Sequence, residues 1–516
     1  MPSPSCLTPW RKIKRYTDIY VVTGVKPTRE NGIAEKRVEY DANGNLTKMS
    51  YFGLDGKPTL CLPIGCAEIR HEYDKRGNRI RESYFGVDGK PTAAHYKIRI
   101  DANVFGGELS TAVFNAMESG KKEGFEIVPG NETTESGSNA EGIVVVEMKN
   151  VAEIRNEYDD HGNRTRVSMW GIDGKPAANS LGIAEVRFEY DAQGNVTRQM
   201  YFSPNGRPAQ NEDGVAEIRS EYDANGNMTK LSYFDVDGKP KADTNGVFEV
   251  RREYDKAGKV IRSAVIYAVT GVKPMREDGI AEERYEYDAD GNVTKRSHFG
   301  LDGKPKADKN GVFEGRREYD KAGKVIRGAK IYAVTGVKPT REDCIAEIRR
   351  EYDADGNLTR ESYFGVDGKP KDDKNGVFEN RWEYDNAGKV IRVAMIYAVA
   401  GVKPTREDGI VEKRVEFDKA GKVIRGAIIY AVAGVKPTRE DGIAEERLEY
   451  DANGNVTKRS HFGLEGKPKA DKDGVFEVRT EYGKDGKRKG KTLIYAVAGV
   501  KPTREDGIAE VRYERD

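Results

Sequence analysis

The chain has 516 residues, of which 34% are charged and 37% are hydrophobic. Lys and Arg number 87 and Asp and Glu 86, so the net charge of +1 excludes the basic footprint of a nucleic-acid or membrane-surface protein. No stretch approaches the roughly 18 consecutive apolar residues of a membrane-spanning helix, and no secretory signal is read at the start.

A repeated unit begins in degenerate form before Tyr40 and recurs to the end of the chain. Each later copy is marked by a Tyr-Asp pair, with Tyr at 40, 73, 158, 190, 222, 254, 287, 319, 352, 384 and 450. Phe417-Asp418 and Tyr482-Gly483 continue the series, and all steps but that from 73 to 158 are 32 or 33 residues. A fixed period of this length is typical of repeat architectures.

The repeats define the expected organisation of the chain. Residues 1–39 form a degenerate first repeat, 40–94 further repeats, 95–149 an insertion, and 150–516 a continuous array. The array closes with a truncated unit, "VRYERD", as a fragment of a longer protein would.

Two versions of the unit exist. Version A reads "EYDADGNVTKRSHFGLDGKPKADKNG", and version B reads "EYDKAGKVIRSAVIYAVTGVKPMREDG". Both place Gly at the fourth position of a turn that begins with Asp, which favours a type I turn closed by a left-handed Gly. The structural turn residues predicted in version A are Asp41, Gly44, Asp191, Gly194, Asp223, Gly226, Asp288, Gly291, Asp353, Gly356, Asp451 and Gly454.

Strand patterns flank each turn. One face of residues 183–190 carries Ala184, Val186, Phe188 and Tyr190, and the other carries Ile183, Glu185, Arg187 and Glu189. This alternation predicts a half-buried strand, and residues 195–202, "NVTRQMYF", predict the strand that returns. In version B, residues 422–435 are apolar on both faces and are expected to need cover on both sides. Residues 302–311, with Pro and polar residues, predict a connector.

The predicted fold is therefore all-β. Fourteen hairpins give about 28 strands in an antiparallel meander, about 130 Å long if flat at about 4.8 Å per strand. Because strand twist accumulates, we expect a long twisted or spiral sheet, a β-solenoid-like array in which each unit contacts its neighbours. Glu and Arg on facing strands are expected to form a solvated charge ladder.

The insertion breaks the pattern. Residues 106–124 predict one short helix with Leu109, Val113, Phe114 and Met117 on one side, and residues 129–142 predict a flexible polar loop. The segment is interpreted as a loop insertion with degraded repeats, or alternatively as a grafted recognition element.

No catalytic, cofactor or metal site is predicted. The five His residues do not cluster, and His298 and His461 occupy a slot that other copies fill with Tyr, so they are expected to be exposed or half-buried aromatic residues. The "DADGN" turns have their Gly too early for a calcium loop. The four cysteines are too few for a disulfide framework, and Cys61 and Cys66 are interpreted as two unpaired thiols rather than a bridge.

The candidate binding residues are rows of aromatic side chains. Buried, they are core; exposed, they would stack on sugar rings or on apolar groups of a partner. They are Tyr51, Phe52, Tyr84, Phe85, Trp170, Tyr201, Phe202, Tyr233, Phe234, His298, Phe299, Tyr363, Phe364, His461 and Phe462. A second motif, "IYAV" or "IYVV", recurs in version B and at Tyr20.

The repeated "YDANGN" and "YDADGN" segments resemble the YD repeats of the bacterial Rhs family. The resemblance covers most of the chain outside the insertion, although the unit is longer than the family's and no toxin domain is recognised. It implies a spiralling β-sheet shell, often around a toxic C-terminal domain, in secreted or cell-surface proteins.

These observations predict a non-enzymatic bacterial repeat protein that serves as a scaffold or binding surface for a protein or carbohydrate partner. The first alternative is a fragment of an Rhs-like toxin-delivery shell. A carbohydrate-active or other enzyme ranks third, because an active site needs unlike residues brought together and the repeats multiply one set.

Overall fold

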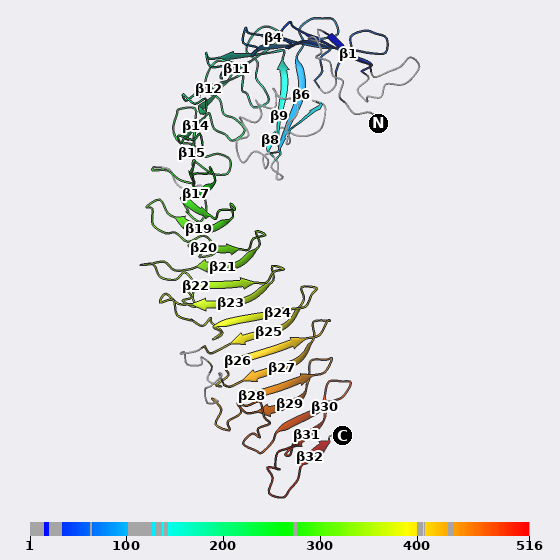
Figure 1. Ribbon diagram of the computed structural model, residues 1–516, viewed down its shortest axis with the longest axis vertical. Helices are drawn as coiled ribbons and strands as arrows, with labels where there is room; N and C mark the ends of the chain where they lie inside the picture. The colour runs from blue at the N-terminus through cyan, green and yellow to red at the C-terminus, as the bar shows by residue number, and fades with distance from the viewer. Residues whose placement is uncertain are drawn as a thin grey trace, which may run out of the picture. The chain divides into compact units, whose positions relative to one another are not determined.

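Residues 15–19, 33–61, 64–101, 125–129, 137–138, 143–271, 276–399, 406, 408–431 and 438–514 are described by the computed structural model. All of their regular elements are β-strands, and the repeated hairpins form a 28-stranded antiparallel sheet (Figure 1). The predicted all-β class of tandem hairpins is confirmed. The chain divides into two compact units, Met1–Gly258 with Val265–Met275 and Lys259–Ala264 with Arg276–Asp516.

The hairpin strands of the first unit each span five to seven residues. They are β1 (Arg15–Ile19), β2 (Glu35–Tyr40), β3 (Leu46–Phe52), β4 (Glu68–Tyr73), β5 (Arg79–Phe85), β10 (Glu153–Tyr158), β11 (Arg164–Trp170), β12 (Glu185–Tyr190), β13 (Val196–Phe202), β14 (Glu217–Tyr222), β15 (Met228–Phe234) and β16 (Glu249–Tyr254). The next strand, β17 (Val260–Ile266), is divided between the units.

The second unit continues the alternation of outgoing and return strands. Its strands are β18 (Glu282–Tyr287), β19 (Val293–Phe299), β20 (Glu314–Tyr319), β21 (Val325–Ile331), β22 (Glu347–Tyr352), β23 (Leu358–Phe364), β24 (Glu379–Tyr384), β25 (Val390–Ile396), β26 (Glu412–Phe417), β27 (Val423–Ile429), β28 (Glu445–Tyr450), β29 (Val456–Phe462), β30 (Glu477–Tyr482), β31 (Arg488–Ile494) and β32 (Glu510–Glu514).

Each hairpin closes through the same bulged turn. In β18–β19 the register shifts between Glu286 and Tyr287, so that Tyr287 pairs with Val293. The amide of Gly291 donates to the Asp288 carbonyl at 3.1 Å, and Gly291 has a φ of +89°. Gly takes this left-handed conformation without the steric cost that a Cβ imposes, so the turn residues fix the register of the strands.

The pairing between the return strand of one hairpin and the outgoing strand of the next depends on whether the first hairpin is version A or version B. The version A strand β19 pairs with β20 over only three positions, ending at Ser297 and Glu314, while Phe299 pairs with Pro305 of its own connector. The version B strand β21 pairs with β22 over five positions, ending at Ile331 and Glu347. The version B return strand therefore pairs with the next hairpin over more residues. The version B repeat that begins at Tyr319 has 33 residues, whereas the version A repeat that begins at Tyr287 has 32.

The sheet has two unlike faces. We call one the tyrosine face. It carries the residue after the first Glu of each outgoing strand, such as Ile348, and the Tyr, His or Met opposite it on each version A return strand, such as Tyr363. The second unit buries on this side a cluster of Val312, Tyr332, Ile345, Ile348, Tyr363, Val377, Tyr397, Ile410, Tyr430 and Ile443. The connectors fold back over it, as when the Lys371 amide donates to the Tyr363 carbonyl at 2.9 Å.

We call the other side the ladder face. It carries the Glu and Arg of each outgoing strand, and the Phe or Trp of each version A return strand with a Ser two residues earlier, which is Met200 in β13. Along β18 these residues are intermediate or exposed, as expected for a strand with one solvated face.

Two of the strand expectations are wrong in detail. Ile183, predicted on the polar face, precedes β12 and is only 2% exposed, because the Ile-Ala pair before each such strand enters the core beneath the connectors. The cover expected on both faces of the version B stretch 422–435 is absent from its described part, residues 422–431. Its strand β27 ends at Ile429, and Ile424 near the hairpin turn is 38% exposed, because the connectors cover the opposite end of the hairpin.

The insertion holds a separate four-stranded antiparallel sheet in the order β7-β6-β9-β8. These strands are β6 (Ala94–Asp101), β7 (Phe125–Pro129), β8 (Gly137–Ser138) and β9 (Ile143–Val151). The prediction that residues 129–142 form a loop is wrong at β8. This strand pairs with residues 144 and 145 of β9, which is rich in β-branched residues. The predicted helix at 106–124 lies outside the described residues. Within the described part of the chain, no helix is long and apolar enough to cross a membrane.

Candidate interaction surface

The first aromatic residue of each predicted pair is buried on the tyrosine face. Tyr51, Tyr84, Tyr201, Tyr233, His298, Tyr363 and His461 are between 1% and 7% exposed. The expectation of exposed or half-buried histidines is therefore wrong. Nδ1 of His298 lies 3.0 Å from the Val312 carbonyl, and Nδ1 of His461 lies 3.0 Å from the Val475 carbonyl. These hydrogen bonds allow an imidazole to replace a tyrosine in the interior.

A buried carboxylate accompanies each of these histidines. Glu283 is 1% exposed and accepts hydrogen bonds from Arg276 at 2.8 Å and from Arg296 and Tyr285 at 2.5 Å. Burial alone would raise the pKa of Glu283, but these donors outweigh it and lower the pKa. The carboxylate is thus a satisfied interior charge.

The second aromatic residue of each pair lies half-buried on the ladder face, beneath an arginine. In each case the guanidinium carbon is 3.8 to 4.2 Å from the ring centroid. The pairs are Arg37–Phe52, Arg70–Phe85, Arg155–Trp170, Arg187–Phe202, Arg219–Phe234, Arg284–Phe299, Arg349–Phe364 and Arg447–Phe462. Each ring therefore caps one face of a planar cation, a cation–π contact worth about 0.5–2 kcal/mol.

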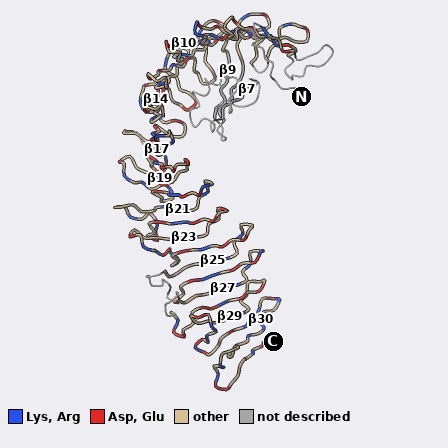
Figure 2. The backbone as a smooth tube through the Cα atoms, in the orientation of Figure 1, with Lys and Arg blue, Asp and Glu red and all other residues tan. Residues whose placement is uncertain are grey.

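The capped arginines also belong to ion pairs. Nε of Arg284 donates to Glu282, two residues earlier on the same side of β18, at 2.6 Å. Across the hairpins, Lys295 Nζ lies 3.3 Å from Glu286 and 3.5 Å from Glu314. Figure 2 shows the resulting mixture of basic and acidic residues along the hairpins. Exposed pairs of this kind contribute only about 0–1 kcal/mol each.

The most enclosed carboxylates of the ladder stay ionised. Glu379 accepts hydrogen bonds from Arg360 at 2.6 Å, from Arg381 at 2.5 Å and from Ser362 at 2.9 Å. Burial would raise the pKa of Glu379, but these donors lower it overall. Glu379 is therefore ionised at neutral pH and is paired with two arginines.

Version B hairpins lack the aromatic cap. At the position of the capping Phe they carry Ile331, Ile396, Ile429 and Ile494, which pair with the first Glu of the outgoing strand. In the described residues of the second unit, no aromatic ring of the chain stacks on the corresponding arginines. We call these the uncapped arginines: Arg316, Arg381, Arg414 and Arg479.

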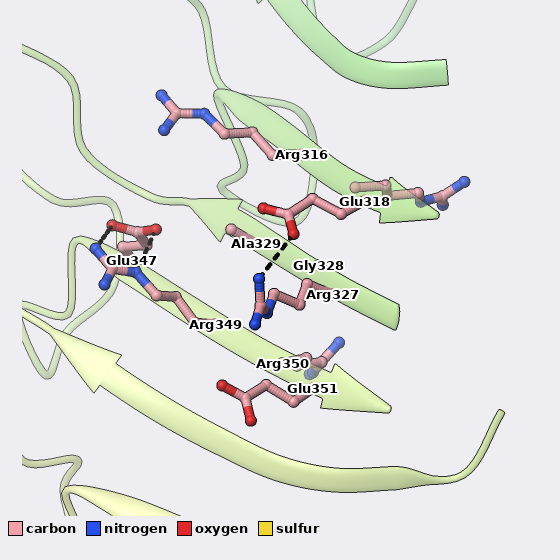
Figure 3. A pocket seen from close by; sticks show the side chains of 10 residues that line it. Arg316, Glu318, Arg327, Gly328, Ala329, Glu347, Arg349, Arg350 and Glu351 are labelled. Atoms are coloured by element: carbon pink, nitrogen blue, oxygen red, sulfur yellow. Dashed lines mark hydrogen bonds and ion pairs between the residues drawn. The ribbon is translucent and has the colours of Figure 1, made fainter. Parts of the chain in front are cut away.

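A hollow of about 340 Å³ lies beside the first uncapped arginine (Figure 3). Ala329 forms its floor, because this residue pairs with Arg316 on one neighbouring strand and with Arg349 on the other. Version A has the larger Ser at this position, as at Ser362, or Met in β13. Figure 3 shows the Arg316 and Arg349 side chains on either side of this floor, with Glu318 and Arg327 nearer the turn.

A wider groove of about 800 Å³ continues from the hollow and shares Arg316 and Glu347 with it. Its walls are the version B connector at 333–339 and the next version A turn at 365–368. Val337 and Val366 line this groove and are 39% and 74% exposed. The surface therefore places apolar groups beside an open guanidinium.

The predicted turn residues lie at the opposite end of the hairpins. Asp41 accepts backbone hydrogen bonds from Asn43 at 2.8 Å and Asn45 at 2.9 Å, and the Asn45 side chain donates at 2.8 Å. The other turn aspartates make the same contacts, and they are Asp191, Asp223, Asp288, Asp353 and Asp451. Gly44, Gly194, Gly226, Gly291, Gly356 and Gly454 all have φ between +82° and +91°.

The sequence predicted the capped arginines as members of a charge ladder, but not their stacking on aromatic rings. Their signal is present: a Glu-x-Arg spacing puts both side chains on one face, and version A places Phe opposite the Glu. Cys61 and Cys66 are both buried free thiols in the structure, and burial raises the pKa of Cys66 to about 12.

Comparisons with known proteins assign no family. No family model matches the chain, and no curated protein matches it. Among solved structures, a TcdB2-TccC3 crystal structure is 14% identical with a TM-score of 0.18, and covers 92% of this chain and 26% of that one. A Photorhabdus luminescens Tc holotoxin pore is 13% identical with a TM-score of 0.17, and covers 89% and 25%.

A crystal structure of the eukaryotic initiation factor also matches, with 9% identity, a TM-score of 0.12, and 80% and 91% covered. This chain spans about a quarter of the length of the Tc toxin chains that it matches. At these TM-scores the likenesses establish no function.

Proposed function

We propose that this protein is a non-enzymatic scaffold whose ladder face binds a partner, either a protein or a carbohydrate. The observation that supports this function is the difference between the two versions of the unit. Version A hairpins cover their own arginines with aromatic rings, whereas version B hairpins carry Ile at that position, and at Arg316 a hollow lies beside the uncapped guanidinium.

The polar residues of the surface support binding over catalysis. Its arginines and carboxylates are members of a repeated series, and Arg316, Arg349 and Arg381 each donate to a Glu two residues earlier. A catalytic site brings unlike groups together around a reacting atom. Here the same Glu–Arg ion pair recurs from one hairpin to the next.

Array binding of the purified full chain tests this function. We expect selective binding to a subset of peptides or of glycans, and loss of that binding when Arg316, Arg381, Arg414 and Arg479 are all replaced by Ala. The control replaces Lys304, Lys369 and Lys467, which lie on connector turns and pair only with a nearby acidic residue, by Ala. Equal binding by the arginine variant and the control would contradict a role for the ladder face.

A fragment of an Rhs-like toxin-delivery shell is the second candidate. It is favoured by the Tyr-Asp turn, which is repeated through both units with one geometry. Reading the coding sequence beyond both ends of the chain tests it: further repeats and an unrelated terminal domain would favour the shell, and their absence would exclude it.

A further inference from the structure

We propose that the uncapped arginines receive aromatic side chains from a partner polypeptide, which stack on the guanidinium groups where version A uses its own Phe. This inference rests on the proposed binding function and names the class of partner. Its sites are Arg316, Arg381, Arg414 and Arg479 in the second unit.

The chain itself supplies the geometric precedent. Arg349 and Arg316 occupy the same position in consecutive outgoing strands, and each donates its Nε to the Glu two residues earlier, at 2.8 Å and 2.6 Å. The Phe364 ring lies 3.9 Å from the Arg349 guanidinium carbon. At Arg316 the corresponding residue is Ile331, which has no planar face to offer. The ion pair holds the guanidinium in place, so an incoming ring meets a preorganised cation.

The hollow has the size and polarity for such a ring. Its 340 Å³ is at the low end of the ~300–1,000 Å³ of small-ligand pockets, so a single side chain is a suitable occupant. Val337 and Val366 in the adjoining groove offer apolar contact to the residues that flank the ring.

The charges around the hollow are paired, which favours an uncharged ring over a charged group. Five arginines and three glutamates line it, and ion pairs such as Arg327–Glu318 and Arg349–Glu347 join the two signs, so a phosphate would have to displace carboxylates that are already in place. A sugar ring prefers an aromatic face, and the uncapped sites offer a guanidinium instead. Phe, Tyr and Trp side chains stack on arginine and carry no charge.

Two uncapped arginines are neighbours. Arg381 and Arg414 both pair with Ala394, on either side of β25, because two version B units follow one another here. Two strand spacings separate them, about 10 Å. A partner with two aromatic residues at that separation would engage both, and linked contacts bind more tightly than either alone.

The test uses a random peptide library displayed on phage, selected against the full chain, and fluorescence anisotropy of the selected peptides. The main variant carries Arg316→Lys, Arg381→Lys, Arg414→Lys and Arg479→Lys, which keeps each charge and removes the planar face. We expect Phe, Tyr or Trp to be enriched in the selected peptides, and their affinity for the variant to fall by about 2- to 30-fold.

Two further variants keep the test decisive. Arg219→Lys changes an arginine that is covered by Phe234 and does not line the hollow, so it should leave peptide affinity unchanged. Phe364→Ile should uncover Arg349 and strengthen the binding of the same peptides. Circular dichroism of each variant establishes that it is folded before its affinity is measured.

The outcomes separate this inference from the proposed function. Selected peptides without aromatic enrichment, or aromatic peptides that bind the wild type and the lysine variant equally, overturn the inference while the scaffold function stands. Binding of glycans alone also overturns it. If neither peptides nor glycans bind, the proposed function falls and the inference falls with it.

Discussion

Gly291 has a φ of +89°, and a Cβ built there would meet nothing within 4 Å. A substitution is therefore opposed by the backbone conformation and not by a clash. We expect Gly291→Val to lower the free energy of unfolding by about 1–3 kcal/mol, because β-branched residues rarely adopt this conformation.

Lys295→Ala is the matched comparison. Lys295 lies in the same hairpin and makes two exposed ion pairs, so its loss should cost less than about 1 kcal/mol. Thermal denaturation of both variants measures the difference. Equal melting temperatures would mean that the left-handed Gly does not hold the turn.

Cys344 offers the reverse experiment. It has a φ of +57° at a position where other copies of the turn carry Gly, such as Gly279 with a φ of +69°. We expect Cys344→Gly to relieve the strain and to stabilise the protein by roughly 0.5–1 kcal/mol, after the entropic cost of Gly in the unfolded chain. The melting temperature in the presence of a reductant measures it. A lower value for the variant would contradict this account.

Single residues differ in how far the sequence predicts them. The conformation of Gly291 follows from the turn motif alone, because the backbone demand is local. The stacking of Arg284 on Phe299 does not, because it depends on which residues lie opposite one another across the hairpin, and that register is set by the bulge at the turn. The burial of His298 also had no local signal.

At the scale of the element, the hairpin turns should be sensitive to acid. Hydrogen bonds from the backbone and side chain of Asn292 lower the pKa of Asp288 below its usual value. The same holds for Asp41, Asp74, Asp159, Asp191, Asp223, Asp353 and Asp451. A lowered folded-state pKa gives stability that is present above the unfolded value of about 3.9 and is lost as pH falls through the folded value.

We therefore expect the denaturation midpoint to fall as pH drops below about 4. Replacing these eight aspartates with Asn should reduce that fall, because Asn accepts the same backbone hydrogen bonds without titrating. Asn179 already does so, accepting from Leu181 at 3.0 Å and Ile183 at 3.1 Å. Urea midpoints at pH 7 and pH 3 measure the effect, and an identical loss in both proteins would exclude the turns as its source.

Strands were predictable where period-two alternation and turn glycines agree, as in β12 and β13. The four-stranded sheet of the insertion was not, because the segments between its strands lack the Asp-x-x-Gly signal and β8 has only two residues. The need of version B strands for cover was overestimated, because apolar composition does not show how far the connectors reach.

At the scale of the whole molecule, the register predicts that the array is modular. Deleting residues 287–351 joins Glu286 to Tyr352, and β18 then meets β23 with the same pairing that β22 has now. We expect this variant to stay folded and resistant to limited proteolysis. The stability of such an array is the sum of the stabilities of the single repeats and of the interfaces between neighbouring repeats.

Deleting only residues 287–302 is the control. It removes the turn and β19, so the outgoing strand β18 would run directly into a connector and lose its register. We expect rapid proteolysis. If the shorter deletion stayed folded while the longer one did not, long-range closure would hold the chain together instead of neighbouring hairpins.

The consecutive antiparallel pairing within the second unit also determines its mechanical response. From β20 to β32 each strand is hydrogen-bonded to the strand that follows it in sequence. Tension between residues 314 and 514 would therefore break the hydrogen bonds of one strand pair after another, and not those of all pairs at once. Each repeat of 32 or 33 residues should lengthen the chain by about 110 Å as it opens, since an extended residue spans about 3.3–3.6 Å. Optical tweezers would record a series of small, even extensions, whereas a single large rupture would mean that the hairpins do not open independently.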